Sequence, residues 1–326
     1  MIDYETQRQK HNEGINKLDY NYVSKGNKIP DKKGFRIQAS QIEGFFSNTN
    51  LWFRKNLLGE DVGFKGSTSS VAGTCVHFAA ESYIKNNLQL PQEDKDEMYA
   101  YIDEQANKFP DLVDPNQCRE IMTPMWRALR EHLQANPGGL AEPFVEIEVL
   151  PGITVGGSID LIQVPGDQTI YTDLEQLRSK SIYIKDYKTT STKYASDKSI
   201  TQSAMTKNYE WQLLVYAYVL KKAYNITTLA IQDIFITREY EGEISEKTGK
   251  RGKAYPSVVV PITKPVTPES LEFIESIINI VAHSVQSFIL NPGPQRGLLS
   301  QDWRLINHTA QLPFPAITSS KVDEEI

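Results

Sequence analysis

The spacing of apolar residues changes near residue 140, and this change restricts the folds that the chain can adopt. Up to about residue 136, helical patterns are interrupted by loop-forming prolines, whereas the segments that follow alternate apolar and polar side chains as half-buried strands do. Helices, then a strand meander, then helix and strand again predict an α/β sandwich with a mixed sheet. The expected helices cover 71–86, 208–223 and 268–290, and the expected strands cover 144–150, 153–164, 181–188, 229–238 and 257–260.

A chain of 326 residues is long enough to form one large domain with appendages at its ends. A helix is expected to begin at Ser40, with Glu43 completing a capping box. The last residues are acidic, and we expect either a plain disordered end or a peptide that binds a protein partner. The expected organisation is an N-terminal arm over 1–36, a folded domain over 37–305 with a helical part (37–140) and a sheet part (141–305), and an acidic C-terminal tail over 306–326.

The composition excludes several classes of protein. A net charge of −6 argues against a protein that coats nucleic acid through its overall charge, although a local basic groove stays possible. Cys75 and Cys118 are too few for a zinc or iron–sulfur site, and they give no sign of a disulfide framework, so we expect a cytoplasmic protein. The most apolar helix, over 271–290, contains Glu272 and Glu275, which favours packing on a core over crossing a membrane.

Two aspartates and a lysine lie on neighbouring expected strands. Residues two apart in a strand share a face, so Asp186 and Lys188 continue the apolar face of Ile182 and Ile184. We expect Asp160 to lie on the adjacent strand, sharing a face with Ser158 and Ile162, and two such carboxylates can converge on Mg²⁺ or Mn²⁺. The alternative for Asp186 and Lys188 is an exposed ion pair at a strand end.

Two helices contribute further polar residues. His77 and Glu81 lie one turn apart on one helix face, and Thr74 lies on the same side, so that either could orient the second ring nitrogen of His77. A lone helical histidine is more often a structural residue than a ligand. Gln212 lies in a nearly all-apolar helix with Tyr216 one turn later, and it either positions Lys188 or bonds a loop carbonyl.

The order of these residues resembles the RecB-like branch of the PD-(D/E)XK nuclease superfamily. The resemblance covers about 70–240 and rests on Gly73–Glu81 around His77, Gly157-Ser158-Ile159-Asp160, Asp186-Tyr187-Lys188 and Gln212 with Tyr216. It implies a mixed central sheet flanked by helices with an added helical N-terminal region, and metal-dependent cleavage of DNA. It also implies that His77, Asp160, Asp186 and the Tyr187 carbonyl bind Mg²⁺ or Mn²⁺, that Lys188 orients the attacking water or stabilises the transition state, and that Gln212 and Tyr216 complete the catalytic set.

The chain also departs from many relatives in this branch. The cysteines of an iron–sulfur cluster are missing, with Ser47-Asn48-Thr49-Asn50 where the first is expected, and no Walker A pattern indicates a nucleotide site. The leading hypothesis is therefore a phage-type or recombination exonuclease that acts on linear ends or single strands of DNA. Lys193, Lys207 and Arg238 are candidate DNA contacts, or part of a solvated face. The alternatives are a non-catalytic scaffold in a replication or packaging assembly, and an RNA-processing nuclease.

Overall fold

The computed structural model describes residues 34–60, 66–88, 92–190, 209–242 and 248–290, together with 6, 9, 10, 13, 23, 25–29 and 244. Two of the candidate DNA contacts, Lys193 and Lys207, lie outside the described residues, as does the tail over 306–326. Part of the predicted N-terminal arm is described. Its turn η2 (Lys25–Asn27) packs on the first strand, where the buried Asn27 amide donates a hydrogen bond to the Arg36 carbonyl.

The described strands form two sheets rather than one. The smaller sheet has the order β1-β4-β3, with β1 parallel to β4 and β3 antiparallel to it. The larger sheet has the order β2-β5-β6-β7-β8 and is mixed, because β6 and β7 are parallel while the other pairs are antiparallel. The strands are β1 (Phe35–Gln38), β2 (Leu140–Ala141), β3 (Phe144–Leu150), β4 (Ile153–Ser158), β5 (Leu161–Gln163), β6 (Ser181–Thr190), β7 (Thr227–Thr237) and β8 (Val259–Pro265).

The single strand predicted over 153–164 is wrong in one respect that matters for the site. The chain leaves the smaller sheet at Ser158 and joins the larger one at Leu161, so Asp160 lies in the bend between β4 and β5. Ser158, Asp160 and Ile162 therefore do not share a strand face, and Ser158 is exposed while Ile162 is fully buried. The alternation of apolar residues continues across the bend, which is why the break is hidden in the sequence.

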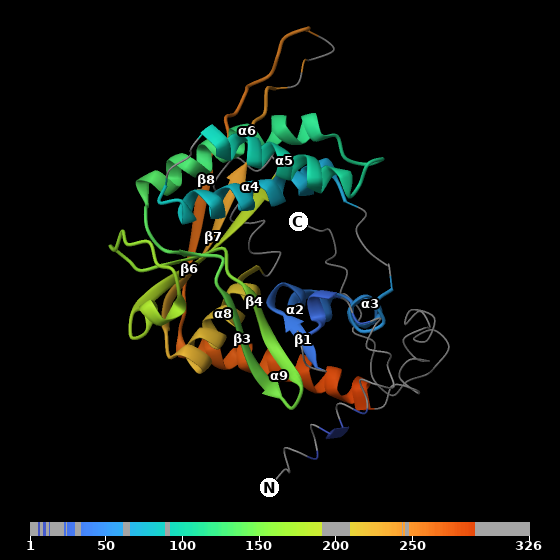
Figure 1. Cartoon of the computed structure of the whole chain (residues 1–326). Helices are drawn as coiled ribbons and strands as arrows, with labels where there is room; N and C mark the ends of the chain where they lie inside the picture. Colours follow the sequence, from blue (N-terminus) through green and yellow to red (C-terminus); the bar gives the residue numbers. More distant parts are fainter. Residues whose placement is uncertain are drawn as a thin grey trace, which may run out of the picture.

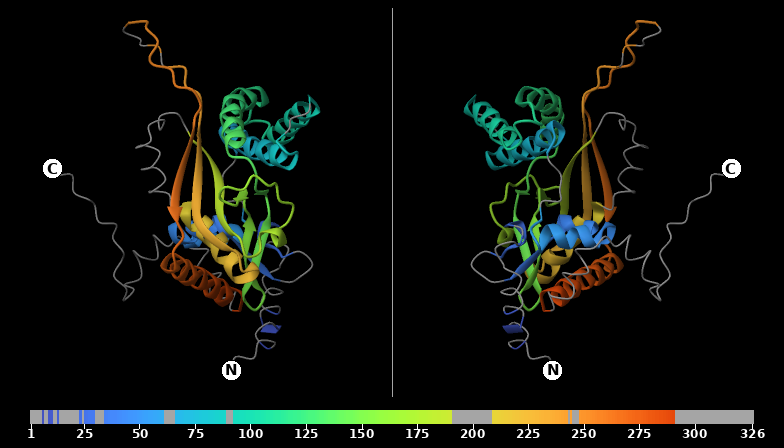
Figure 2. Two further views of the ribbon diagram at one scale, coloured as in Figure 1. Left: turned by 90° about the vertical axis from the view of Figure 1, so that its left-hand side faces the viewer. Right: turned by 90° about the vertical axis from the view of Figure 1, so that its right-hand side faces the viewer.

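The helices lie on both sides of the larger sheet. Figure 1 shows α4, α5 and α6 grouped above it, and α8 and α9 on the opposite side near the smaller sheet; both views in Figure 2 agree. The mixed α/β architecture with flanking helices and a helical N-terminal region is thus confirmed. The helices are α2 (Ile42–Ser47), α3 (Thr49–Asn56), α4 (Thr68–Lys85), α5 (Gln92–Asn107), α6 (Pro115–Ala135), α8 (Tyr209–Tyr224) and α9 (Pro268–Leu290), with short turns η3 (Ala39–Gln41) and η4 (Leu174–Leu177).

Strand β6 separates two hydrophobic cores. Ile182 and Ile184 are buried in the core that contains α8 and α9, whereas Tyr187 is buried in the core formed by α4, α5 and α6. The predicted alternation of faces along β6 is therefore correct. Asp186 and Lys188 continue the face that is directed toward α8.

The predicted capping box is wrong, and a capping box occurs instead at another helix. The capping box at Ser40 is wrong, because Ser40 lies in η3 and α2 begins at Ile42 without a side-chain cap. A capping box does occur at α4, where Ser67 accepts a hydrogen bond from the Ser70 amide.

Helix α9 is long and apolar enough to cross a membrane by composition alone. Its apolar face is buried in the core with α8, as expected for a helix of a folded domain.

Candidate active site

The Asp160 side chain takes the position of a backbone hydrogen-bond partner at the edge of β6, beyond the last paired residue of β5. Pairing between β5 and β6 ends at Leu161 and Lys185, which leaves the edge of β6 open at Tyr187. The Asp160 Oδ2 atom accepts the Tyr187 N–H there at 2.7 Å. Because the N–H and C=O of one strand residue point to the same edge, the Tyr187 carbonyl is also directed toward this side. The bend between β4 and β5 thus places a carboxylate and a carbonyl at one strand edge.

His77 reaches the same carboxylate from α4. Its Nδ1 atom lies 3.2 Å from Asp160 Oδ2, and 32% of the His77 side chain stays exposed. The two residues that we expected to orient His77 have other partners, since Glu81 binds Lys85 and the Thr74 hydroxyl donates to the Ser70 carbonyl. Asp160 is the side chain that holds the ring in this structure.

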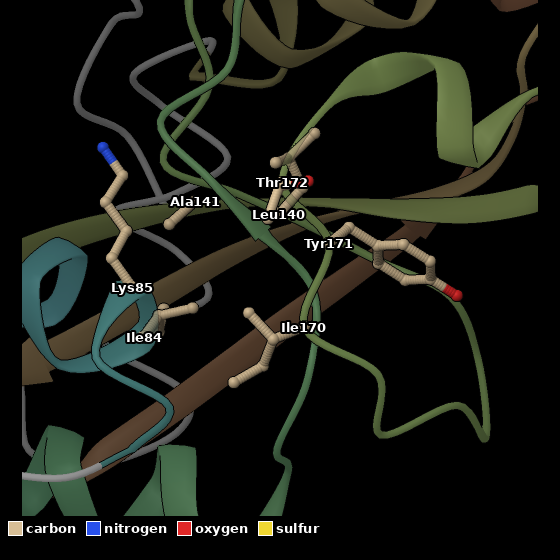
Figure 3. A pocket seen from close by; sticks show the side chains of 7 residues that line it. All are labelled: Ile84, Lys85, Leu140, Ala141, Ile170, Tyr171 and Thr172. Atoms are coloured by element: carbon tan, nitrogen blue, oxygen red, sulfur yellow. The ribbon is translucent and has the colours of Figure 1, made fainter.

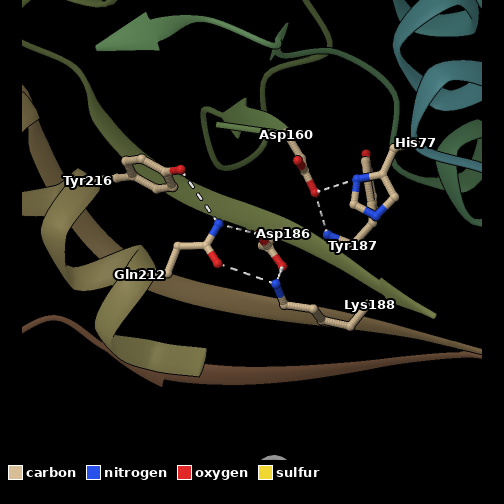
Figure 4. A network of polar contacts seen from close by, with 7 residues as sticks. All are labelled: His77, Asp160, Asp186, Tyr187, Lys188, Gln212 and Tyr216. Atoms are coloured by element: carbon tan, nitrogen blue, oxygen red, sulfur yellow. Dashed lines mark hydrogen bonds and ion pairs between the residues drawn. The ribbon is translucent and has the colours of Figure 1, made fainter. Parts of the chain in front are cut away.

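Asp186, Lys188 and Gln212 form a second part of the same network (Figure 4). The Lys188 ammonium lies 2.6 Å from Asp186 Oδ2. The Gln212 amide from α8 links the pair, because its Nε2 donates to Asp186 Oδ1 at 3.1 Å and its Oε1 accepts from Lys188 at 3.4 Å. Gln212 Nε2 also donates to the Tyr216 hydroxyl at 3.5 Å. Of the two roles left open for Gln212, the contact with Lys188 is the one present, and the amide binds the aspartate as well.

Two glycines bring the smaller sheet close to this network. A Cβ atom on Gly156 would lie 2.0 Å from the Val145 carbonyl oxygen of β3, so only glycine fits there. Gly157 has a φ of +155°, and a Cβ atom on it would lie 3.1 Å from the Tyr216 hydroxyl. The Gly-Gly pair therefore lets the chain turn toward Asp160 while Tyr216 packs directly on the backbone.

Burial and charge set the protonation of the four ionisable groups. Burial raises the pKa of Asp186 to about 6, against the opposing effect of Lys188. Burial would raise the pKa of Asp160, but the His77 charge and hydrogen bond outweigh it and hold that pKa below its usual range. Burial would likewise lower the pKa values of His77 and Lys188, yet the charges of Asp160 and Asp186, respectively, raise both. Each carboxylate is therefore stabilised in its charged form by a basic partner, Asp160 by His77 and Asp186 by Lys188.

Residues 36–251 match the model of a family described as the PD-(D/E)XK nuclease superfamily. The chain belongs to the PD-(D/E)XK nuclease superfamily. No curated protein sequence matches it significantly. Among solved structures, it is similar to a protein of Eubacterium rectale described as a proposed exonuclease, with 13% identity over 86% of each chain and a TM-score of 0.45. It also matches LHK-Exo in complex with dAMP, with 8% identity over 71% of this chain and 97% of that one and a TM-score of 0.31.

Members of the PD-(D/E)XK superfamily generally use divalent metals such as Mg²⁺ or Mn²⁺. The Asp160 and Asp186 carboxylates and the Tyr187 carbonyl are oxygen donors, the class that such hard cations prefer. Within the part of the chain that the structure describes, no three His, Cys, Asp or Glu side chains are gathered closely enough to hold a metal ion. The carboxylates are instead turned to His77 and Lys188. The chemistry of the donors fits a divalent metal, and their present positions pair them with His77 and Lys188.

A groove leads away from this PD-(D/E)XK network. Its volume is about 380 Å³, and it lies between the first turns of α4 and the end of β6. A Cβ atom on Gly73 would lie 2.8 Å from the Thr189 hydroxyl oxygen, so glycine keeps α4 close to β6 along the groove. The wall of the groove carries hydroxyl groups together with the basic side chains of His77 and Lys188. The lining residues are Ser70, Gly73, Thr74, His77, Tyr187, Lys188 and Thr189.

A second pocket, of about 240 Å³, lies near the last turn of α4 and is shown in Figure 3. Its lining is mostly apolar and includes none of the residues of the network. Its one charged lining residue, Lys85, is paired with Glu81. The groove beside Lys188 is thus the better candidate for a phosphodiester substrate.

The structure places two further carboxylates next to the network that sequence reasoning missed. The Glu142 N–H donates to the Asp160 carbonyl at 3.2 Å, and burial together with the Asp160 and Glu81 charges raises the pKa of Glu142 to about 7. Asp233 is the β7 neighbour of Asp186 in the parallel register, and it is 4% exposed. An aspartate inside the apolar run of β7 was a visible signal for the second of these.

Asp233 is expected to destabilise the fold at neutral pH. Burial raises its pKa from 3.8 to about 6, so the folded state holds a proton more tightly than the unfolded state. Stability is therefore lost as the pH rises from about 4 to about 6 and stays reduced above that. Asp233→Asn should recover up to about 3 kcal/mol at pH 7.5 and almost none at pH 4.

Urea unfolding of both proteins at the two pH values, without metal, checks this prediction. Asp111→Asn, at an exposed aspartate in the loop between α5 and α6, is the matched control and should change little at either pH. An equal effect of Asp233→Asn at both pH values would contradict the assignment.

Arg238 and Lys185 are more buried than basic residues that contact phosphates at a protein surface. The Arg238 side chain is half-buried, and among the described residues its Nε atom has no hydrogen-bond partner, while burial lowers its pKa. Lys185 is 6% exposed, and burial lowers the pKa of its ammonium to about 8. Lys185 therefore belongs to the packed face of β6, and Arg238 stays a candidate contact only through its position beyond the end of β7.

Proposed function

We propose that this chain is a divalent-metal-dependent DNA nuclease of the RecB-like branch. We propose further that it acts in the cytoplasm as an exonuclease in recombination, repair or phage DNA processing. The observation that carries the proposal is the meeting of Asp160, Asp186 and Lys188 at one edge of β6, beside a groove. A scaffold protein would have no need to bury Asp186 beside Lys188, because an ion pair of this kind costs desolvation energy.

Asp160, Asp186, the Tyr187 carbonyl and His77 are the groups that we propose for holding Mg²⁺ or Mn²⁺. When bound, such a metal lowers the pKa of a water molecule and neutralises charge on the phosphate. His77 shares Asp160 with the Tyr187 N–H, so it also fixes the orientation of that carboxylate. The three elements that supply these groups are α4, the bend between β4 and β5, and β6.

Lys188 is the residue that we propose for stabilising the transition state. It lines the groove, and the Asp186 charge keeps its ammonium protonated at neutral pH. A fixed cation aimed at the phosphate stabilises the negative charge that develops during hydrolysis. Gln212 acts through Lys188 and Asp186 by holding both in position, and Tyr216 supports the Gln212 amide.

The purified chain is expected to degrade linear duplex and single-stranded DNA when Mg²⁺ or Mn²⁺ is supplied, and to stop when the metal is chelated. Closed-circular DNA should survive, because an exonuclease needs an end, and nicked circles should be attacked from the nick. An RNA substrate of the same sequence distinguishes an RNA-processing enzyme. Absence of cleavage on every substrate with either metal would overturn the proposal and favour a scaffold.

A further inference from the structure

A two-stranded ribbon extends the sheet between β7 and β8. Tyr240 and Tyr255 exchange both backbone hydrogen bonds, at 2.9 and 2.7 Å, and Ile244 pairs with Arg251 in the same register. We use the name ribbon for the described residues 238–242, 244 and 248–258. Figures 1 and 2 show it as the orange hairpin that projects away from the rest of the molecule. The described residues of the ribbon contribute nothing to the hydrophobic cores.

The ribbon begins at the end of the sheet where the candidate site lies. The Arg238 N–H donates to the Thr190 carbonyl, two residues after Lys188 on β6. Lys188 is in register with Phe235, and Tyr240 follows five residues later. At a rise of about 3.3 Å per residue, Tyr240 lies about 16 Å beyond Lys188 along the strand direction. In duplex DNA this distance corresponds to about five base pairs.

The returning strand of the ribbon is basic. Residues 247–253 read KTGKRGK, with four basic residues and no acidic one, in a chain whose net charge is −6. Of these, Lys250, Arg251 and Lys253 are described and all are exposed. Arg251 pairs with Glu241 on the outgoing strand at 2.6 Å, which fixes its direction. A short basic run on an exposed ribbon is typical of a phosphate-binding surface.

Two tyrosines lie at the base of this basic strand. The Tyr240 and Tyr255 rings are stacked with their centroids 6.3 Å apart, and the Lys253 ammonium lies 5.1 Å from the Tyr255 ring centre. Tyr255 is 38% exposed although it makes these contacts. Exposed aromatic rings beside cations are the combination that binds nucleic-acid strands without reading their sequence.

We propose that the ribbon is a second nucleic-acid contact. By the register of the ribbon its basic residues lie beyond Tyr240, so they would hold the phosphate backbone about seven to ten base pairs from the scissile phosphate. This inference rests on the proposed nuclease function. The basic charge is confined to the returning strand, since the outgoing strand carries Glu239 and Glu241. A nucleic-acid strand is favoured over an acidic protein surface because the ribbon continues from the same end of the sheet as Lys188. The ribbon would then determine how long a substrate must be to bind tightly, while the chemical step stays with the residues of β6.

The test replaces Lys250, Arg251 and Lys253 together with glutamine. Binding to a labelled 30-base-pair duplex is measured with Ca²⁺ in place of Mg²⁺, at several salt concentrations. The triple variant should bind about 10-fold or more weakly, and the slope of log K against log salt should fall by about 2 to 3. Because the ribbon is outside the hydrophobic cores, the circular dichroism spectrum and melting temperature should match those of the unchanged protein. The matched control replaces Lys55, Lys108 and Lys221, three exposed lysines on α3, α5–α6 and α8, and should keep the original slope.

Cleavage kinetics separate the ribbon from the site. With Mg²⁺, the triple variant should show a raised KM and an unchanged kcat on the 30-base-pair duplex, and unchanged values on a single-stranded tetranucleotide that is too short to reach Tyr240. Equal affinity and slope for the variant and the unchanged protein would overturn the inference, as would an equal loss in the control.

The outcomes also distinguish the two proposals. If the unchanged protein binds duplex through the ribbon and cleaves nothing, the nuclease function fails and the ribbon contact stands. If the protein cleaves DNA and the triple variant instead loses only self-association, the ribbon is a protein contact and the inference is overturned.

Discussion

Asp186→Ala and Lys188→Ala are each expected to reduce DNA cleavage by about 100- to 1,000-fold or more. Asp186 is 3% exposed and lies 2.6 Å from the Lys188 ammonium. Bulk water therefore cannot take over the contacts of either side chain when it is removed. Loss of Lys188 removes a fixed cation that lines the groove, and groups of this kind contribute about 10² to 10³ in rate. Loss of Asp186 removes a proposed metal ligand and leaves the Lys188 ammonium half-buried without its carboxylate.

Single-turnover cleavage of a linear duplex at saturating protein measures this loss apart from binding. Asp186→Asn and Lys188→Met keep the side-chain volumes, and both should be as inactive as the alanine variants. Asp111→Asn and Lys221→Ala change exposed residues of the same types and should retain full activity. If the variants at Asp186 and at Lys188 both keep their cleavage activity, the active site does not lie at the edge of β6.

Asp160→Asn is expected to abolish stabilisation by Mn²⁺. A ligand that binds only the folded state at 100 times its Kd stabilises that state by about 2.7 kcal/mol. For a chain of this size the melting temperature should then rise by about 4 °C with Mn²⁺, because the unfolding entropy is about 2.1 cal/mol/K per residue. The asparagine variant keeps the shape of the side chain but lacks the charge that a divalent cation requires, so its melting temperature should not change.

The stabilisation by Mn²⁺ should also depend on pH. Burial raises the pKa of Asp186 to about 6, so this carboxyl is mostly protonated at pH 5 and must release its proton before it can bind a cation. The melting shift should therefore be small at pH 5 and full at pH 7.5. Differential scanning calorimetry at both values checks the effect. A full shift in Asp160→Asn would show that Asp160 is not a ligand, and Asp111→Asn should respond like the unchanged protein.

The side-chain directions along β6 could be predicted from the sequence, whereas the position of Asp160 could not. Residues two apart on a strand share a face, so the joint direction of Asp186 and Lys188 follows from their spacing alone. Gln212 was expected either to position Lys188 or to bond a loop carbonyl, and its amide contacts Lys188 and Asp186 in the structure. These contacts could be anticipated because each depends on the geometry of one regular element or on one strong polar group in an apolar helix.

Other features depend on contacts that no local pattern records. The bend at Asp160 is set by a change of sheet partner, and the alternation of apolar residues does not reveal it. Glu81 has Lys85 one turn away on the same helix, and this lysine competes with His77 for the Glu81 carboxylate. Glu142 and Asp233 approach the network only through folding of distant segments. For Asp233, the register of β6 with β7 had to be known before its neighbour Asp186 could be named.

The hydrogen bond from the Tyr187 N–H to Asp160 also protects an unpaired strand edge. Beyond the last β5 partner, β6 would present free backbone groups on this side, and such groups can pair with a strand from another molecule. We therefore expect the carboxylate to keep the protein from associating through this strand, in addition to its proposed role in the chemistry. An inactive variant intended for trapping a substrate complex is consequently better made at Asp186 than at Asp160, because a larger change at Asp160 would uncover the edge and promote self-association.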